Sequence, residues 1–570
     1  MIQISRRMLL AMAGAGLVRG QEAAGDARNV APPGTRTVYP LKSWADRAAW
    51  EQHAAHLRRR LLLANGLWPV PEKTMLMTRP HGRVNHGDFI TECVLIETWP
   101  GLWIAANVYL PAKRQGRVPG VLVAHGHWKN GRLENTDECS TPLLCANLAA
   151  QGYLAVAYDM VGYNESDQLP HRFGTTPEEQ AWHYGPLGIQ TWNSIRMLDF
   201  LVSRDEVDRE RIGMTGASGG GTQTFLLAAL DERVKAVAPV NMISAHFQGG
   251  CDCENGPGLR WGTNNVETGS MAAPRPQLLV AATGDWTRDV PRIEYPAIRK
   301  VYELYDAGDR ITTWQQTAGH NYNQASREAV YRFFHGLWGD KERPAPVESV
   351  GAPPIDSLRA RKEERPAEAL SAAAFFEQWK ARCRAATKGL GIEDKRARLA
   401  ALMGMDASLG PVRLEDGSLR TDAGWRIPAE VLKEGGKGGV LMLRTGDGAP
   451  VAGPGATATV LSIQLFQTGA ASTARPRDAQ HFLTFNASDE VCRVQDVLAG
   501  VAWLRTKVGV GLVDVVAGDA VSQWAALVAQ AVAGPGVIRL RGARGVPQAG
   551  PVPGLEFAGG MEVVRELGAR

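Results

Sequence analysis

Net charge and long apolar runs are both scarce in this 570-residue chain. Lys and Arg number 63 and Asp and Glu 59, which gives a formal net charge of +4. That balance is typical of an ordinary globular protein rather than one with a basic nucleic-acid-binding face, so no nucleic-acid partner is expected. No apolar run beyond the N-terminus is long enough to span a bilayer, so no membrane span is predicted.

Cysteine is also sparse, with 7 residues spread over the whole chain. An odd, scattered set is not a disulfide framework. Most of them should be small buried hydrophobic residues, although Cys139 with Cys145, or Cys251 with Cys253, could form a bridge in an oxidising compartment. No spacing of Cys and His is typical of a zinc site. We therefore predict no metal.

The N-terminus carries the one feature that indicates a compartment. Arg6 and Arg7 precede an apolar run of small residues that ends at Val18. This pattern predicts a twin-arginine-type signal over residues 1–25, and hence a periplasmic or secreted protein. The alternative is the basic start of a cytoplasmic helix.

The rest of the chain is too long for one hydrophobic core, and changes in its residue pattern divide it into segments. Residues 26–115 predict a helix and then strands that lead into a sheet. Residues 116–341 alternate short apolar strands with helices, which predicts an α/β fold with a mostly parallel sheet covered on both faces. Residues 342–368 are rich in proline and charge and indicate a linker, and residues 369–570 form a second unit.

The strongest chemical signal is the small-residue sequence Gly216–Gly221, which contains Ser218. It lies between an apolar strand, Ile212–Thr215, and a helix predicted over Thr222–Leu230. Small neighbours permit a sharp strand-to-helix turn that presents the hydroxyl as a nucleophile. The helix N-terminus would then face the negative charge that forms on the attacked group. The alternative is a glycine-rich structural loop.

Residues that could activate this serine follow it along the chain. His320 lies in the loop before the last helix of the first unit, where a general base would belong. Asp285 follows the preceding strand and is the predicted acid, which would orient the imidazole and stabilise its charged form. Asp289 is a near alternative for the acid, and Glu254 a more distant one.

An oxyanion hole is predicted where the strand Val121–Ala124 runs into His125–Trp128. The backbone amide of His127, or alternatively that of Trp128, would act with the amide of Gly219 on the developing negative charge. Metal binding by the two histidines of this segment is disfavoured, because residues two apart on a strand face opposite ways.

Together these motifs resemble the α/β-hydrolase superfamily over about residues 85–340. More narrowly they resemble bacterial carbohydrate esterases of the acetyl xylan esterase type. Trp68-Pro69 and the loop Cys251–Asn255 are similar to a subgroup that includes pectin methylesterase-like enzymes. The resemblance implies a Ser-His-Asp triad that works through an acyl-enzyme. No cofactor is implied, since this chemistry needs only side chains and backbone dipoles.

The second unit repeats the order of strands and helices of the first, which indicates an internal duplication. The spacing from Val501–Leu504 to Ala520 nearly matches that from Leu198–Leu201 to Ser218, so Ala520 stands where the serine would be. The only histidine after residue 335 is His481, and it precedes this position. We predict a degenerate α/β-hydrolase-like domain with a structural or binding role.

Aromatic residues are frequent in the loops that should surround the site. Flat aromatic faces suit the apolar C–H faces of sugar rings, and an arginine could pair with a uronate carboxylate. The predicted substrate-binding residues are Trp128, Tyr163, Trp182, Arg260, Trp261 and Trp286. For each residue alone, packing in a core or a cap is the alternative.

The leading hypothesis is an exported serine esterase that removes acetyl or methyl groups from plant polysaccharide, with a polysaccharide or oligosaccharide ester as its partner. A peptidase or dienelactone-type hydrolase on the same triad is one alternative. The other is a non-catalytic, carbohydrate-binding tandem in which both hydrolase units are inactive. A fold alone does not choose the ester, because substrate preference in such enzymes depends on cap loops.

Overall fold

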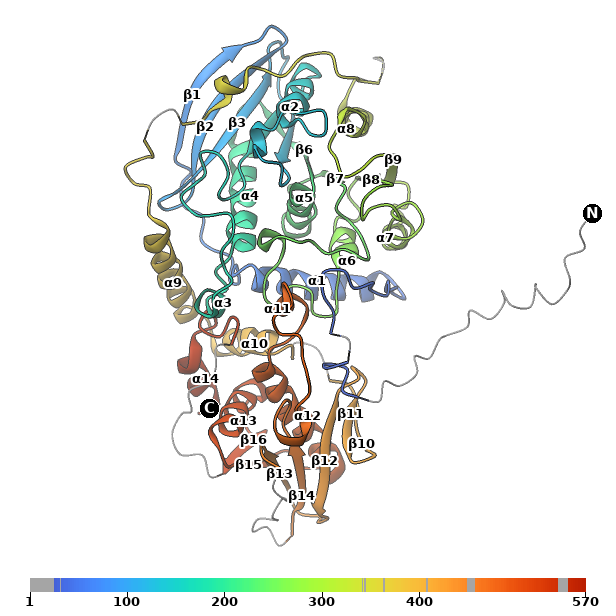
Figure 1. Cartoon of the computed structure of the whole chain (residues 1–570), viewed down its shortest axis with the longest axis vertical. Coiled ribbons are helices and arrows are strands. Elements are labelled where there is room, and N and C mark those ends of the chain that lie inside the picture. Colours follow the sequence, from blue (N-terminus) through green and yellow to red (C-terminus); the bar gives the residue numbers. More distant parts are fainter. Residues whose placement is uncertain are drawn as a thin grey trace, which may run out of the picture.

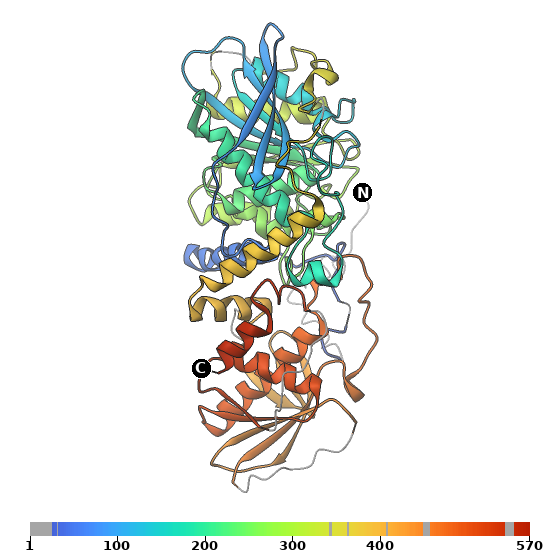
Figure 2. The same ribbon diagram turned by 90° about the vertical axis from the view of Figure 1, so that its left-hand side faces the viewer.

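The computed structural model describes residues 25–30, 32–340, 342, 345–361, 364–405, 409–447, 457–541 and 552–569. All but the last residue of the predicted export signal lies outside these described residues. The chain forms two α/β units that lie one beyond the other along the long axis of the molecule (Figures 1 and 2). Within the described part of the chain, every helix is too short or too polar to cross a membrane.

The first unit is built on a nine-stranded sheet of order β1-β2-β3-β5-β4-β6-β7-β8-β9. β1 to β3 are antiparallel, β3 pairs antiparallel with β5, and the remaining neighbours are parallel. The strands are β1 (Thr78–Asn85), β2 (Phe89–Trp99), β3 (Leu102–Pro111), β4 (Val118–Ala124), β5 (Leu154–Tyr158), β6 (Val207–Ala217), β7 (Ala236–Val240), β8 (Gln277–Ala282) and β9 (Ile311–Gln316). This architecture confirms the predicted α/β fold.

Helices cover both faces of this sheet, because its central strands are apolar on both sides. In β4, Leu122 packs in one core with α4, whereas Val121 and Val123 pack in another with α2 and α8. The helices are α1 (Arg47–Ala64), α2 (Thr141–Ala150), α3 (Pro177–Ala181), α4 (Pro186–Ser203), α5 (Gly219–Leu230), α6 (Asn265–Ser270), α7 (Glu294–Glu303) and α8 (Gln324–Trp338). Burial of both faces explains why these strands read as continuous apolar runs.

The second unit has a seven-stranded sheet of order β10-β11-β12-β14-β13-β15-β16. As in the first unit, three antiparallel strands come first, the third pairs antiparallel with the fifth, and the rest are parallel. Its strands are β10 (Val412–Glu415), β11 (Ser418–Thr421), β12 (Arg426–Lys433), β13 (Gly439–Arg444), β14 (Thr459–Gln464), β15 (Val513–Ala517) and β16 (Ile538–Arg541). Its helices are α9 (Ala372–Lys388), α10 (Ile392–Leu402), α11 (Phe482–Phe485), α12 (Asp489–Val508), α13 (Ala520–Ala533) and α14 (Gly560–Gly568).

The shared strand order identifies β15 as the counterpart of β6, and the turns that follow them differ. One residue, Ser218, separates β6 from α5, whereas Gly518 and Asp519 separate β15 from α13. Asp519 is the N-cap of α13 with an extended φ of −131°, while Ser218 holds the same place at a φ of 58°. The prediction that Ala520 matches the serine is therefore wrong by one residue, because the second turn is longer and relaxed.

The segment predicted as a linker is packed against the first unit. Leu358 is fully buried, and its carbonyl accepts hydrogen bonds from Asn107 Nδ2 at 2.8 Å and from the Arg132 guanidinium at 2.9 Å. Beyond it, α9 places Trp379 against Trp99 of β2, with ring centroids 5.5 Å apart. The connection between the units is thus fixed by buried contacts rather than free.

One buried histidine lies at the boundary of the two units. His183 Nδ1 donates to the carbonyl of Leu63 at 2.7 Å, and its ring stacks on Phe557 of the second unit at 5.4 Å. Burial lowers the pKa of His183 to about 4, and the hydrogen bond to Leu63 only partly offsets this. The histidine is therefore neutral in the folded protein at neutral pH.

We predict that His183 makes the protein less stable as the pH falls from about 6.5 to about 4. Its pKa is lower in the folded than in the unfolded chain, so in this window unfolding takes up a proton, at a cost to stability of up to about 3 kcal/mol. In His183→Asn the amide can keep the bond to Leu63, and Asn tolerates the φ of 45° found here. Urea unfolding at several pH values should show that the free energy of unfolding falls less with falling pH in this variant than in the wild type. Equal slopes for the two proteins would contradict the prediction.

Candidate active site

Ser218 occupies a strained turn that its neighbours enforce. It lies at the N-terminus of α5 with φ 58° and ψ −124°, a conformation that a residue with a side chain rarely adopts. A Cβ added to Gly216 would lie 2.4 Å from the carbonyl oxygen of Ala124, and one added to Gly220 would lie 2.0 Å from the same oxygen. Only glycine fits at these two positions, which accounts for the composition of the turn.

His320 and Asp285 are joined by a hydrogen bond. His320 Nδ1 lies 2.9 Å from Asp285 Oδ2, across the loops that follow β9 and β8. The other carboxylate oxygen of Asp285 accepts from the backbone amide of Thr287 at 2.7 Å and from its hydroxyl at 2.5 Å. The carboxylate is thus fixed in place, and it holds the proton of the imidazole on Nδ1.

With Nδ1 protonated, the lone pair of His320 is on Nε2. This atom is buried and has no hydrogen-bond partner among the described residues. The ring contacts Trp128, at 5.7 Å between centroids and nearly parallel, and Trp286 at 4.3 Å. The two indoles hold the imidazole while its basic nitrogen stays free to take a proton.

The two other acids considered for this role are engaged elsewhere. Asp289 forms ion pairs with Arg288 and Arg292, whose side chains are largely exposed. Glu254 accepts a hydrogen bond from the hydroxyl of Thr222 at 3.1 Å, and its second oxygen accepts from the amides of residues 250 and 251. Of the three carboxylates, Asp285 is the one that the structure brings to His320.

The residues predicted to form the oxyanion hole are in contact. A Cβ on Gly219 would lie 2.5 Å from Cε1 of His127, so the imidazole ring packs directly on the residue after the serine. His125 is turned away: Nδ1 donates to the Gly126 carbonyl at 2.7 Å, and Nε2 accepts from the Met160 amide at 2.8 Å. Burial lowers the pKa of His125 to about 3, and this neutral ring has no nitrogen left for a metal.

Beside this turn lies a cluster that spacing along the chain did not reveal. Ring nitrogens of His127 and His171 and the thiols of Cys251 and Cys253 lie within 4.8 Å of one another. The prediction of no metal rested on spacing, which cannot detect donors that three separate loops bring together. The one local sign was the Cys-Asp-Cys sequence. All 7 cysteines are buried and none forms a disulfide, so neither predicted bridge is present.

Three of the aromatic residues predicted to bind substrate lie at the site. Trp128 and Trp286 contact His320, and the ring of Tyr163 lies 4.8 Å from that of His125. Trp182 and Trp261 lie elsewhere, and for them the prediction is wrong: the guanidinium of Arg384 in α9 lies 4.9 Å from the centre of the Trp182 ring, and Trp261 Nε1 donates to the Leu483 carbonyl in α11. Both indoles help to join the two units.

Arg260 also proves to be structural. It is 4% exposed, and its guanidinium donates to Asn265 Oδ1, to the carbonyl of Glu254 and to Asn255 Oδ1. All three of its nitrogens are used in these bonds, since the second terminal nitrogen also bonds Asn265. The predicted pairing with a uronate carboxylate is corrected accordingly: burial leaves no donor facing solvent.

The fold and this constellation define an α/β-hydrolase, and comparisons with known proteins agree. Residues 101–343 match the family described as X-Pro dipeptidyl-peptidase (S15 family). The chain is 31% identical to the solved structure of Methylesterase BT1017, with a TM-score of 0.52, over 60% of this chain and 78% of that one. It is 26% identical to the protein YtaP of Bacillus subtilis (strain 168) over 300 residues, 48% of this chain and 97% of YtaP.

A glucuronoyl esterase from Solibacter usitatus is more distant, at 15% identity and a TM-score of 0.41, over 54% of this chain and 99% of that one. The chain belongs to the α/β-hydrolase superfamily and, within it, to the family of Methylesterase BT1017. It is therefore a hydrolase.

We predict that Arg260→Met lowers stability without weakening substrate binding. The variant leaves buried acceptors of Glu254, Asn255 and Asn265 without their donor, at a cost of about 3 kcal/mol in the free energy of unfolding. Urea unfolding measures that loss, and Arg288→Met, which removes an arginine that is 63% exposed, serves as the control. A raised KM at unchanged stability would show instead that Arg260 contacts substrate.

Proposed function

We propose that this chain is a serine esterase that cleaves methyl or acetyl esters of a carbohydrate polymer. The observation that carries the proposal is the pairing of a strained serine turn with a hydrogen-bonded His320–Asp285 couple. Such a turn stores backbone strain, and its known role in hydrolases is to hold a nucleophilic hydroxyl at a helix N-terminus. The name of the related methylesterase favours a methyl ester over an acetyl ester.

In the proposed reaction Ser218 Oγ attacks the ester carbonyl while His320 Nε2 takes its proton. The tetrahedral intermediate carries its negative charge toward the backbone N–H groups of Gly219 and His127. Collapse breaks the ester bond, and His320 returns the proton to the leaving alcohol, which is methanol for a methyl ester. Water then attacks the acyl-enzyme with His320 as base, and the acid product leaves. Asp285 stays ionised and stabilises the imidazolium.

Carbohydrate is the proposed substrate class because aromatic rings lie against His320 and against the histidine of the turn after β4. Trp128, Trp286 and Tyr163 offer apolar faces on which sugar rings can stack. Polar recognition would come from the cap segment 159–186, which follows β5. The N-terminal twin-arginine pattern supports export to the periplasm or medium, where polysaccharide is found.

The second unit is proposed to serve structure or binding rather than catalysis. At the place that matches Ser218 it has Asp519, whose carboxylate caps α13 through the amides of Val521 and Ser522. Its one histidine, His481, lies before β15 in the sequence and bonds to the carbonyl of Gly250 in the first unit. This unit thus supports the site from outside through α11 and its preceding loop.

A peptidase is the second candidate, since residues 101–343 match a dipeptidyl-peptidase family. Amide cleavage would use the same serine, histidine and oxyanion donors. Recognition of a free N-terminal ammonium would require an available carboxylate near the serine, and Glu254 has both oxygens occupied by internal hydrogen bonds. The ester reaction needs no such partner, and we favour it.

We predict ester cleavage by Ser218. Wild-type protein should release methanol from methyl-esterified pectin, or acetate from acetylated xylan, and should not cleave X-Pro-nitroanilides. Ser218→Ala should lower kcat by on the order of 10⁵-fold, because the triad acts as a unit. Both products can be measured by coupled enzymatic assay. Proline-nitroanilide cleavage in place of ester cleavage would contradict the ester proposal, and full activity in Ser218→Ala would contradict the nucleophile.

The two aspartates of the loop after β8 should differ in their effect on kcat. Asp285→Asn should lower kcat by on the order of 10⁴-fold, since an amide no longer holds the proton on His320 Nδ1. Asp289→Asn, four residues along, should leave kcat within about twofold, because its partners are exposed arginines. Steady-state kinetics on one ester suffices. The reverse ranking would move the acid to Asp289.

A further inference from the structure

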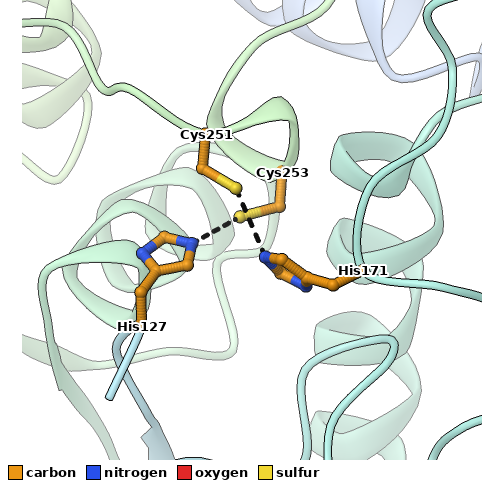
Figure 3. Close-up of side chains that lie close together, drawn as sticks. All are labelled: His127, His171, Cys251 and Cys253. Carbon is orange, nitrogen blue, oxygen red and sulfur yellow. Dashed lines mark hydrogen bonds between the residues drawn. The ribbon is translucent and has the colours of Figure 1, made fainter. Parts of the chain in front are cut away.

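We propose that His127, His171, Cys251 and Cys253 bind one zinc ion beside the serine turn. Figure 3 shows the four side chains pointing toward one another, with both cysteines on one short loop and each histidine on a separate segment. Two imidazoles with two thiolates in a compact group are the donor set of a tetrahedral zinc site. We call these residues the His2Cys2 cluster.

The distances in the His2Cys2 cluster suit zinc. His127 Nε2 lies 3.1 Å from Cys253 Sγ, and His171 Nε2 lies 3.3 Å from Cys251 Sγ. With zinc bonds of about 2.3 Å to sulfur and about 2.0 Å to nitrogen, a tetrahedral site separates sulfur from nitrogen by about 3.5 Å. These two sulfur–nitrogen pairs thus need to move by only a few tenths of an ångström. The full set, whose members lie within 4.8 Å of one another, reaches zinc geometry with shifts on the order of 1 Å.

The tautomer of His171 is set for metal binding. Its Nδ1 lies 2.7 Å from the carbonyl oxygen of Val161, which can only accept, so this nitrogen carries the proton. The lone pair of the neutral ring is therefore on Nε2, the atom that faces Cys251. Metal-binding histidines commonly donate their second ring N–H to a carbonyl or carboxylate in this way.

The loop that carries the two cysteines is fixed by its own bonds. Glu254 accepts from the amides of Gly250 and Cys251, and Asn255 Nδ2 donates to the carbonyl of Cys251 at 2.8 Å. From the second unit, Gln480 Nε2 donates to the Gly250 carbonyl at 3.0 Å. Because these bonds already hold the loop in place, its backbone needs to rearrange little when an ion binds.

The charge and coordination define the role of the ion. Two thiolates balance the +2 charge of zinc, so a buried site would be neutral, and Cys251 and Cys253 are 6% and 1% exposed. Four protein donors leave no open coordination position, which is the arrangement of a structural zinc rather than a catalytic one. The ion would not touch the substrate.

The position of the cluster gives this structural zinc a consequence for catalysis, which rests on the proposed function. His127 supplies one predicted oxyanion amide, and its ring packs on Gly219, the source of the other. His171 belongs to the cap segment 159–186. Zinc would hold the oxyanion turn, the cap and the loop after β7 together, so we assign His127 and His171 as positioning residues for the oxyanion hole.

Metal content tests the site without reference to activity. Full-length Ser218→Ala, made with zinc in the medium and without a histidine tag, should contain about one zinc per chain by inductively coupled plasma mass spectrometry. Cys251→Ser with Cys253→Ser, and His171→Gln, should lose it. Cys145→Ser and His246→Gln, which change residues outside the cluster, should keep it. His171→Cys should also keep it, because Cys3His is an equally good zinc site.

Cobalt exchange provides an independent readout, as Co²⁺ in the cluster should show the strong visible bands of tetrahedral coordination and a thiolate charge-transfer band. Circular dichroism verifies that each variant is folded. The proposal is overturned by folded wild type without metal, by iron or copper in place of zinc, or by zinc that stays in both ligand variants. A Cys251–Cys253 disulfide, seen as two hydrogens missing in the intact mass, would also overturn it.

The positioning role has its own readout in the protein with Ser218 intact. Removal of zinc by a chelator, or His171→Gln, should lower kcat on a small nitrophenyl ester by on the order of 10²-fold, with a smaller change in KM, as expected when one oxyanion donor is misplaced. Zinc should restore the chelated wild type but not His171→Gln. Unchanged kcat in a zinc-free chain would refute the positioning role and leave the metal assignment to the content measurement.

Discussion

The close approach of β4 to the start of α5 is the constraint on which the site depends. The carbonyl of Ala124 would lie 2.4 Å from a Cβ at Gly216 and 2.0 Å from one at Gly220, so strand and helix meet where only backbone fits. Ser218, between these glycines, takes a positive φ and stands at the helix N-terminus. The same approach brings the turn after β4, with His127, against Gly219. The proposed nucleophile and the proposed oxyanion donors therefore depend on the same contact between β4 and α5.

Much of the fold could be predicted because its central strands are apolar on both faces. β4, β6 and β8 read as short apolar runs between helices, and their order fixed where a base and an acid should follow the serine. The edge strands were harder to predict from the sequence. β1 has mostly exposed residues and pairs only with β2, so nothing in its own composition separates it from a loop. Strands of this kind are defined by a neighbour rather than by their own sequence.

The residues of the site also differ in how far the sequence predicts them. Ser218, His320 and Asp285, the proposed triad, could be singled out from the sequence because each follows the end of a strand. Trp182 and Trp261 could not be assigned, since an indole that faces another domain has the same sequence signature as one that faces a sugar. The His2Cys2 cluster could not be found either, because its donors come from three loops whose approach depends on tertiary packing.

Two units with the same strand order but different turns support a division of labour. In the first, a strained turn holds a serine; in the second, a relaxed turn holds Asp519 as a helix cap. Only the serine of the first unit is proposed to be reactive. Labelling of the full-length chain with a fluorophosphonate, followed by peptide mapping, should give one adduct, on Ser218. No adduct, or an adduct on a serine of residues 369–570 such as Ser522, would contradict it.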